Sequence, residues 1–320
     1  MERRPDIYAF LGNDAPIIIN TDIDGILSGL LLTGHAGARV VGFCNSSDTV
    51  WVQPDYANRL DECVFIDMYV PMNGIRCLDQ HIIALDQEHS ASLVADGRVL
   101  NPNLERMRTF NPRESYWIKY PFSTAVYILS LLDLEQDSSW MKLDALVGTH
   151  TVLDILLRAD DALWTSVGSN YTRNASDWWA WIIRQAVTPG PLQRLHEAIL
   201  ATSTKSAAQT KVTLGAMFKD RFGCDRPDGG SNRICNSSGF VTAAWRNLVS
   251  EIGIAAEIGS IGTEQQLVAL SGRTKRFSPS RHQLAELRNE GTVDDQPVFS
   301  YAFVRAPGSP DSLSLTCALR

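Results

Sequence analysis

Residues 16–29, "PIIINTDIDGILSG", join a short run of branched apolar residues to two aspartates and a glycine. Ile17–Ile19 are typical of a buried parallel strand, and the residues from Gly25 onward predict a turn into an apolar helix. Asp22 and Asp24 therefore follow the carboxyl end of a strand, where open α/β sheets bind their ligands. Two carboxylates this close together repel each other, and a bound cation would relieve the repulsion.

The same stretch also has a purely structural interpretation. An aspartate is a common N-cap residue of a helix, and a glycine permits the positive φ angles of tight turns. The motif alone leaves both interpretations open, so the rest of the chain has to separate them.

Strand-like and helix-like segments alternate through the first half of the chain. A helix is expected over residues 25–34, and further strands over 38–45, 63–67 and 75–81. This alternation predicts an α/β fold with a mostly parallel sheet flanked by helices.

From about Tyr116 the apolar spacing becomes helical, and the end of the chain contains two strand-like segments, 297–304 and 312–319. The second half therefore predicts a second, smaller α+β domain. Helices are expected over residues 121–132, 138–163, 175–187 and 192–223. The expected organisation is a first domain of residues 1–190, a helical connector of 191–222 and a small domain of 223–320.

Length and composition set limits on the class of protein. A chain of 320 residues is long enough for two domains. The net charge of −7 gives no overall basic field that would attract nucleic acid or an anionic membrane. The six cysteines are scattered, which favours free thiols in a reducing compartment over a zinc site. No segment is typical of a signal peptide or a membrane span, so we expect a cytoplasmic protein without a membrane partner.

Acidic and imidazole side chains follow three of the expected strands. Asp22 and Asp24 follow the first strand, Asp67 ends a later one, and Asp79 and His81 end the next. Carboxylates with one imidazole are typical ligands of Mg²⁺ or Mn²⁺, so we expect one or two such ions as cofactors. Two ions of this kind can activate a water molecule and clamp a phosphoryl group.

The order of these motifs resembles that of the DHH (Asp-His-His) phosphoesterase superfamily, which includes RecJ-type exonucleases, oligoribonucleases, cyclic-dinucleotide phosphodiesterases and family II pyrophosphatases. The resemblance covers roughly residues 15 to 165. The matching positions are Asp22-Ile23-Asp24-Gly25, Asp67 in "VFIDMYV", Asp79-Gln80-His81 and Asp160 in "RADDAL", with Asp154 in "VLDILLR" as a competing match for the last.

The resemblance implies a hydrolase that cleaves a phosphodiester or phosphoanhydride of a nucleotide, an oligonucleotide or pyrophosphate. The partner would be a phosphate-containing small molecule or a short oligonucleotide. His81 would hold the scissile phosphate or assist the leaving group. It also implies metal ligation by Asp22, Asp24, Asp67 and Asp160 or Asp154, and catalytic roles for Asp24, Asp79 and His81.

Two positions depart from the motifs of the superfamily. RecJ-type relatives carry a further aspartate where this chain has Asn20, and pyrophosphatases carry a histidine where it has Ile18. In the third motif, the position of the usual histidine ligand is Gln80. One of the two metal sites would then be impaired, or rebuilt from His89 or Asp161.

The segment "SGRTKRFSPSR" is the densest basic loop of the chain. Its residues Arg273, Lys275 and Arg276 are candidates for binding substrate phosphates from the second domain. A solvated basic loop without a function explains the same composition.

Two rival functions remain open. A haloacid dehalogenase-like phosphatase also begins with strand-Asp-x-Asp-Gly and uses the first aspartate as a nucleophile, but it leaves Asp79 and His81 unexplained. A DHH-like nucleotide-binding protein with impaired or no catalysis is favoured by Asn20 and Gln80. The metal content of the protein would separate the binder from the enzyme.

Overall fold

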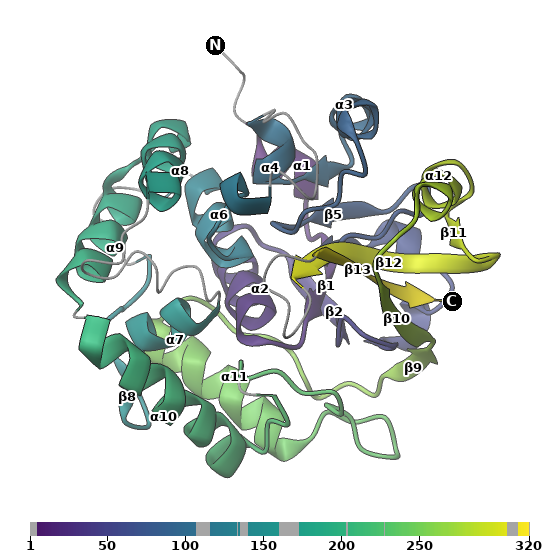
Figure 1. The fold of residues 1–320 in the computed structure, drawn as a ribbon. Helices are drawn as coiled ribbons and strands as arrows, with labels where there is room; N and C mark the ends of the chain where they lie inside the picture. The colour runs from purple at the N-terminus through teal and green to yellow at the C-terminus, as the bar shows by residue number, and fades with distance from the viewer. Residues whose placement is uncertain are drawn as a thin grey trace.

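The computed structural model describes residues 5–106, 116–132, 134, 140–159, 173–202, 204–226, 228–305 and 313–319. These residues form an α/β fold in which a mostly parallel sheet lies between a layer of helices and a second, antiparallel sheet (Figure 1).

The central sheet has seven strands in the order β6-β5-β4-β1-β2-β3-β9. The five strands from β6 to β2 are parallel, and β3 and β9 extend the sheet in antiparallel pairing. The strands are β1 (Pro16–Asn20), β2 (Arg39–Cys44), β3 (Thr49–Val52), β4 (Val64–Ile66), β5 (Arg76–Leu78), β6 (Val99–Leu100) and β9 (Val268–Ser271).

Strand β1 shows why the sheet needs cover on both faces. Ile17 and Ile19 pack into the helical core, whereas Ile18 packs into the core beneath the antiparallel sheet, and all three are fully buried. Alternate residues of a strand point to opposite faces, so a continuous run of isoleucines indicates burial on both sides. The sequence pattern of this stretch therefore dictates a three-layer arrangement.

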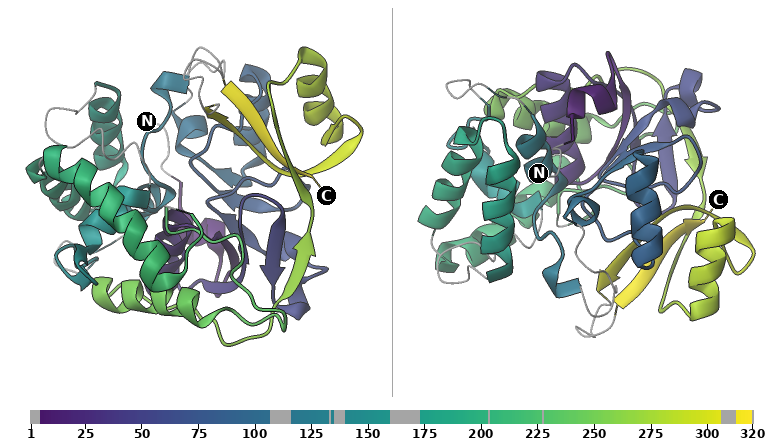
Figure 2. Two further views of the ribbon diagram at one scale, coloured as in Figure 1. Left: turned by 60° about the horizontal axis from the view of Figure 1, so that its bottom comes forward. Right: turned by 90° about the horizontal axis from the view of Figure 1, so that it is seen from above.

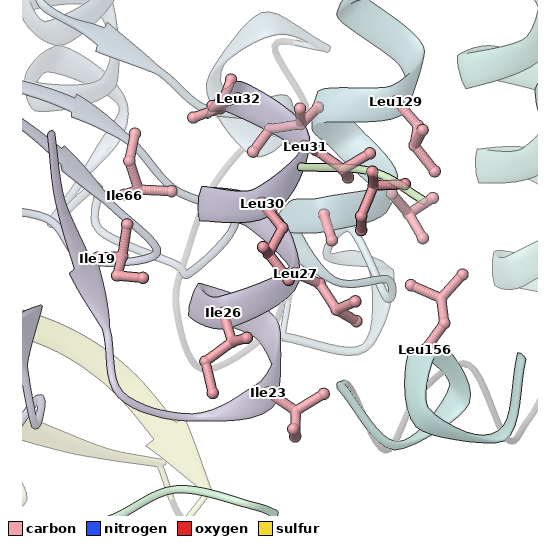
Figure 3. Close-up of a cluster of buried hydrophobic side chains, with 14 of the residues drawn as sticks. Ile19, Ile23, Ile26, Leu27, Leu30, Leu31, Leu32, Ile66, Leu129 and Leu156 are labelled. Carbon is pink, nitrogen blue, oxygen red and sulfur yellow. The ribbon is translucent and has the colours of Figure 1, made fainter. Parts of the chain in front are cut away.

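Helices cover one face of the sheet (Figures 1 and 2). Helix α2, which follows β1 directly, is buried around most of its circumference, and its leucines contact residues of α6 and α7 (Figure 3). The layer consists of α2 (Ile23–His35), α6 (Thr124–Leu131), α7 (Val152–Ala159), α8 (Arg173–Gln185), α9 (Gly190–Ala201), α10 (Thr204–Phe222) and α11 (Ala243–Ala256).

The opposite face is covered by a four-stranded antiparallel sheet in the order β10-β13-β12-β11 and by helix α12 (Figure 2). These elements are β10 (Arg273–Phe277), α12 (Arg281–Glu290), β11 (Thr292–Val293), β12 (Gln296–Arg305) and β13 (Leu313–Leu319). Outside these layers the structure has the helices α1 (Ile7–Leu11), α3 (Gln87–Asp96) and α4 (Pro102–Glu105) and the short 3-10 helices Pro54–Tyr56, Leu60–Glu62 and Tyr116–Ile118.

The α/β class and the mostly parallel sheet expected from the sequence are confirmed, and the expected strands of the first half correspond to β1, β2, β4 and β5. The two expected C-terminal strands correspond to β12 and β13. The sequence pattern did not predict β3, β6 or β9.

The single helix expected over residues 138–163 is wrong for the described part of that range. Residues 140–151 contain a small hairpin of β7 (Leu146–Val147) and β8 (His150–Thr151), and only Val152–Ala159 is helical. Gly148 has a φ of 65° in the hairpin turn, which ends any helix there. Thr151 then caps the new helix, because its Oγ1 accepts a hydrogen bond from the N–H of Asp154 at 3.1 Å.

Two further expectations need correction. The long helix over 192–223 is divided into α9 and α10 near Thr202, whose Oγ1 donates a hydrogen bond to the carbonyl of Ala198. The basic segment, expected as a loop, contains strand β10 over Arg273–Phe277, paired with β13. Alternating exposed and half-buried residues suit the edge of a sheet as well as a loop, and composition alone did not distinguish the two.

The proposed division at residues 190 and 222 stays a prediction, and the contacts add detail to it. Trp245 and Leu248 of α11 belong to the same core as α2, and β9 belongs to the central sheet. The residues after Gly272 form the antiparallel layer. In the part of the chain that the structure describes, no helix is long and apolar enough to cross a membrane.

Candidate metal centre

The ends of β1 and β4 mark the point where the order of the parallel strands reverses. From β1 the chain continues to β2 on one side, and it later returns to β4 on the other side of β1. Open α/β sheets bind ligands in the crevice outside the carboxyl ends of the strands at such a reversal. Asn20 ends β1 and Asp67 follows β4, so the topology places the candidate residues at this crevice.

The first motif forms the N-terminus of α2. Asp22 is the N-cap residue, and its Oδ1 accepts a hydrogen bond from the N–H of Gly25 at 3.0 Å. A side chain at position 25 would lie 2.2 Å from the carbonyl oxygen of Asn20, so the turn requires glycine. The structural interpretation of the motif is therefore correct for Asp22 as the N-cap, whereas Gly25 lies inside α2 without a positive φ and is required by the close approach of Asn20. The N-cap hydrogen bond leaves Oδ2 of Asp22 for other contacts.

Asp24 connects α2 to α6, a helix that lies far away in the sequence but packs against α2. It is buried, and its oxygens accept hydrogen bonds from the N–H groups of Thr124 at 2.8 Å and Ala125 at 2.9 Å, at the start of α6. Burial raises the pKa of Asp24 well above its usual value, and the nearby carboxylates of Asp67 and Asp22 raise it further. Asp24 thus positions α6 against α2, a structural task that the motif did not reveal.

Asp67 lies directly after β4 with a φ of 60°, an uncommon conformation for a residue other than glycine. Its Oδ1 accepts a hydrogen bond from Thr124 Oγ1 at 2.8 Å, and its Oδ2 accepts one from Asn20 Nδ2 at 3.0 Å. Burial raises the pKa of Asp67 to about 8, with further contributions from Asp22 and Asp79 that His81 partly opposes.

The third motif brings a carboxylate and an imidazole into contact. Asp79 Oδ1 lies 2.6 Å from His81 Nδ1, and Asp79 is fully buried. Burial alone would lower the pKa of His81, but the carboxylates of Asp79 and Asp67 together outweigh it and the pKa rises to about 9. The backbone of this motif is fixed by two buried or half-buried amides, because Asn101 donates to the carbonyl of His81 and Asn103 to that of Gln80.

Asp67, Asp79 and His81 together form a group that could hold a cation. One ligand atom from each residue lies within 4.8 Å of the others. Among the described residues, no other set of three acidic, histidine or cysteine side chains comes this close together. Two oxygens beside it, Asp79 Oδ2 and Gln80 Oε1, are buried without a hydrogen-bond partner. Unpaired buried oxygens are costly, and a cation held by the group would pair that of Asp79.

A glycine-rich segment from the second half of the chain packs against the first motif. The N–H of Ile23 donates to the carbonyl of Asp228, and Thr21 Oγ1 donates to the carbonyl of Ser231 at 2.9 Å. Gly229 has a φ of 78°, and a side chain there would lie 2.4 Å from the side chain of Ile23. The glycine therefore permits this close approach.

The same segment brings a basic residue to the site. Arg226 Nη2 lies 2.6 Å from Asp228 Oδ2 and 3.7 Å from Asp22 Oδ2. Burial raises the pKa of Asp22, and the Arg226 guanidinium opposes part of that increase. Sequence reasoning missed Arg226, although its neighbours "DGG" indicated a turn that could approach another backbone closely.

The remaining candidate metal ligands are Asp154, Asp160, Asp161 and His89. Asp160 and Asp161 lie outside the described residues. Asp154 Oδ2 accepts a hydrogen bond from the N–H of Thr151 at 2.9 Å, so its contacts lie at the start of α7. His89 Nδ1 accepts a hydrogen bond from the N–H of Leu85 at the start of α3.

The basic residues of β10 contact residues of their own layer. Arg273 Nη2 donates to Gln296 Oε1 at 2.8 Å, and Lys275 forms an ion pair with Asp294. Arg276 pairs with Thr316 of β13 in the backbone register. None of these contacts joins β10 to Asp67, Asp79 or His81.

Comparison with known proteins adds no family. None of the family models matches this chain, and no curated protein and no solved structure is significantly similar to it.

Proposed function

We propose that this protein is a metal-dependent phosphoesterase of the DHH type, which hydrolyses a phosphodiester or a phosphoanhydride. The observation that carries the proposal is the meeting of Asp67, Asp79 and His81 within 4.8 Å at the strand reversal. The order of the sequence motifs supports the same class of reaction.

The side chains at the site fit a hard divalent cation. Two carboxylates and one imidazole suit Mn²⁺ or Mg²⁺, and the buried Asp79 Oδ2 has no hydrogen-bond partner. When bound, such a cation supplies a Lewis acid that stabilises negative charge on a phosphoryl group.

The chain's own residues would perform the remaining tasks. The hydrogen bond between Asp79 and His81 fixes the orientation of the imidazole, which is 31% exposed on the solvent side of the site. Arg226 could bind phosphate oxygens through a guanidinium that Asp228 orients. Asp24 would act indirectly, because its hydrogen bonds to α6 place Thr124 against Asp67.

The variant His81→Gln distinguishes two roles for His81, metal ligand and proton donor to the leaving group. If His81 binds the cation, the variant loses Mn²⁺ affinity in a calorimetric titration. If His81 instead assists the leaving group, as the sequence resemblance implies, the variant keeps Mn²⁺ affinity and loses turnover. We expect the first result, because His81 belongs with Asp67 and Asp79 to the group whose ligand atoms lie within 4.8 Å of one another.

The proposed activity is tested by a substrate screen with added Mn²⁺. Short oligonucleotides, cyclic dinucleotides and pyrophosphate represent the three open substrate classes, and product release is followed by chromatography or phosphate detection. Hydrolysis of one class that stops on chelation and in Asp67→Asn supports the proposal. Stoichiometric Mn²⁺ binding without hydrolysis of any class would contradict it.

A second candidate function is a phosphate-ligand-binding protein without turnover. Asp24 favours it, since both of its oxygens already accept hydrogen bonds from backbone N–H groups. This candidate predicts binding of a nucleotide that is recovered unchanged after prolonged incubation with Mn²⁺.

A further inference from the structure

The side chain of Asn20 lies between two carboxylates of the candidate site. Its Nδ2 donates to Asp22 Oδ2 at 2.9 Å and to Asp67 Oδ2 at 3.0 Å. Asn20 is itself 97% buried, since only 3% of its surface is exposed. A single amide nitrogen therefore bridges one oxygen of each carboxylate.

The orientation of this amide is fixed by its other end. Asn20 Oδ1 accepts a hydrogen bond from the N–H of Thr21 at 2.8 Å. A backbone N–H can only donate, so the oxygen of the amide must face it and the NH₂ group must face the carboxylates. Both hydrogens of that NH₂ group are then used, one for each aspartate.

A cation shared by Asp22 and Asp67 would have to take the place of this NH₂ group. Ions such as Mg²⁺ contact carboxylate oxygens at about 2.0–2.1 Å, in contrast to the longer contacts of a hydrogen bond. The amide reduces the repulsion between the two carboxylates by donating to both, as a cation would by its charge. The oxygen of Asp67 on the other side, Oδ1, still faces Thr124 and His81.

We infer that Asn20 takes the place of one of two cations, so that the protein binds a single divalent ion at Asp67, Asp79 and His81. This inference rests on the proposed metal centre but not on turnover. Asn20 thus stabilises the carboxylates of Asp22 and Asp67 by hydrogen bonds, without adding a compensating charge.

The inference is tested by counting bound ions in the variant Asn20→Asp. A third carboxylate beside Asp22 and Asp67 removes the donor and creates an anionic site between them. Calorimetry and the fraction of free Mn²⁺ measured by electron paramagnetic resonance should give one ion per chain for the natural protein and two for the variant. The thermal stabilisation by Mn²⁺ should also be larger in the variant than in the natural protein.

Asn45→Asp is the matched control. Asn45 is also buried and also donates to a carboxylate, that of Asp48 at 3.0 Å, in the turn between β2 and β3. The control introduces the same charge outside the site, and it should keep one ion per chain. A second ion in this control would show that any added carboxylate raises the count, which would overturn the inference.

Other outcomes also decide the matter. Two ions bound by the natural protein would overturn the inference directly, whether or not the variant folds. A folded Asn20→Asp protein that still binds one ion would overturn it as well. One ion per chain without hydrolysis of any substrate would contradict the proposed function and leave the inference standing, so the two failures are distinguishable.

Discussion

Asp67 directly follows β4 in a left-handed conformation, and its two oxygens accept hydrogen bonds from Asn20 and Thr124. We expect Asp67→Asn to abolish stoichiometric Mn²⁺ binding, because it removes one of the two carboxylates of the group. The fold should remain, since an amide oxygen can accept the same hydrogen bond from Thr124, and only the hydrogen bond from Asn20 is lost. Calorimetric titration measures the first effect and circular dichroism the second. Unchanged Mn²⁺ affinity would contradict the assignment of Asp67.

Asp154→Ala is the variant to compare with Asp67→Asn, because it tests whether Asp154 is a metal ligand. Asp154 and Thr151 form reciprocal hydrogen bonds at the start of α7, the arrangement of a capping box. Loss of this cap should lower the free energy of unfolding by about 0.5–2 kcal/mol. Mn²⁺ affinity should stay the same, and a decrease would show that Asp154 is a ligand after all.

Gln80 offers a second residue for testing the site. Its Oε1 is buried without a hydrogen-bond partner, and its Nε2 lies 3.5 Å from His81 Nε2. We expect Mn²⁺ affinity to increase in Gln80→His, because an imidazole is a stronger ligand than an amide oxygen. Gln80→Met, which has a similar length but no oxygen, should bind Mn²⁺ less tightly than the natural protein. Equal affinities in all three proteins would indicate that position 80 does not contact the cation.

The buried charges also predict how stability depends on pH without metal. The pKa of Asp67 is about 8 in the folded protein, whereas an unfolded aspartate has a pKa of about 3.9. The folded state therefore binds more protons between these values, and the free energy of unfolding falls as pH rises from about 4 to 8. His81, with a raised pKa of about 9, loses its stabilising contribution as pH rises further through that value, so both groups act in the same direction.

Urea unfolding with a chelator, at several pH values between 4 and 8, measures this dependence. Asp67→Asn should have a flatter profile, because the titrating carboxyl is gone. Added Mn²⁺ should stabilise the natural protein more at pH 8 than at pH 5, since a cation binds the ionised carboxylates. Stability that rises with pH in the presence of the chelator would contradict the prediction.

At the scale of elements, the glycine-rich segment brings Arg226 to the first motif, whereas Arg273 of β10 donates to Gln296 within the antiparallel layer. We now expect Arg226 to be more important for substrate than Arg273 and Arg276. Arg226→Ala should lower kcat/KM by about tenfold or more, since a charged hydrogen bond contributes about 1.5–3 kcal/mol.

The double variant Arg273→Ala/Arg276→Ala is the control for charge. It removes more positive charge than Arg226→Ala does, yet it should change kcat/KM by less. The reverse order of effects would return the phosphate-binding role to β10, as the sequence alone suggested. Both proteins should bind Mn²⁺ normally, which separates substrate binding from metal binding.

Strands β1, β2, β4, β5, β12 and β13 and the acidic residues of the site could be predicted from the sequence because their signals are local. A run of isoleucines followed by Asp-x-Asp-Gly indicates a strand end within a few residues. The partners of these residues could not be predicted, because they come from distant positions. Asp24 accepts hydrogen bonds from α6, and Arg226 approaches from far along the chain. The helix expected over 138–163 failed for a different reason, since one positive-φ glycine interrupts an otherwise helical pattern.

At the scale of the whole molecule, the helical layer and the central sheet both contain residues from the two halves of the chain. Trp245, Leu248 and Ile252 of α11 are buried in the helical core, and β9 pairs with β3. We therefore expect the fragment 1–222 to lack cooperative unfolding, because it would leave part of that core exposed to water. Urea unfolding followed by tryptophan fluorescence and circular dichroism tests this. A cooperative transition in the fragment would support independent folding of the predicted first domain.

The pairing of β3 with β9 also affects how the protein forms on the ribosome. Strand β3 ends at Val52, whereas β9 begins at Val268. At translation rates of about 5–20 residues per second, β3 would wait roughly ten to forty seconds for its partner. Throughout that interval the nascent chain carries an unpaired strand edge, the kind of surface on which other chains can assemble. Successful production of this protein therefore depends on what shields the edge of β3 during synthesis, and slower translation would lengthen the period of risk.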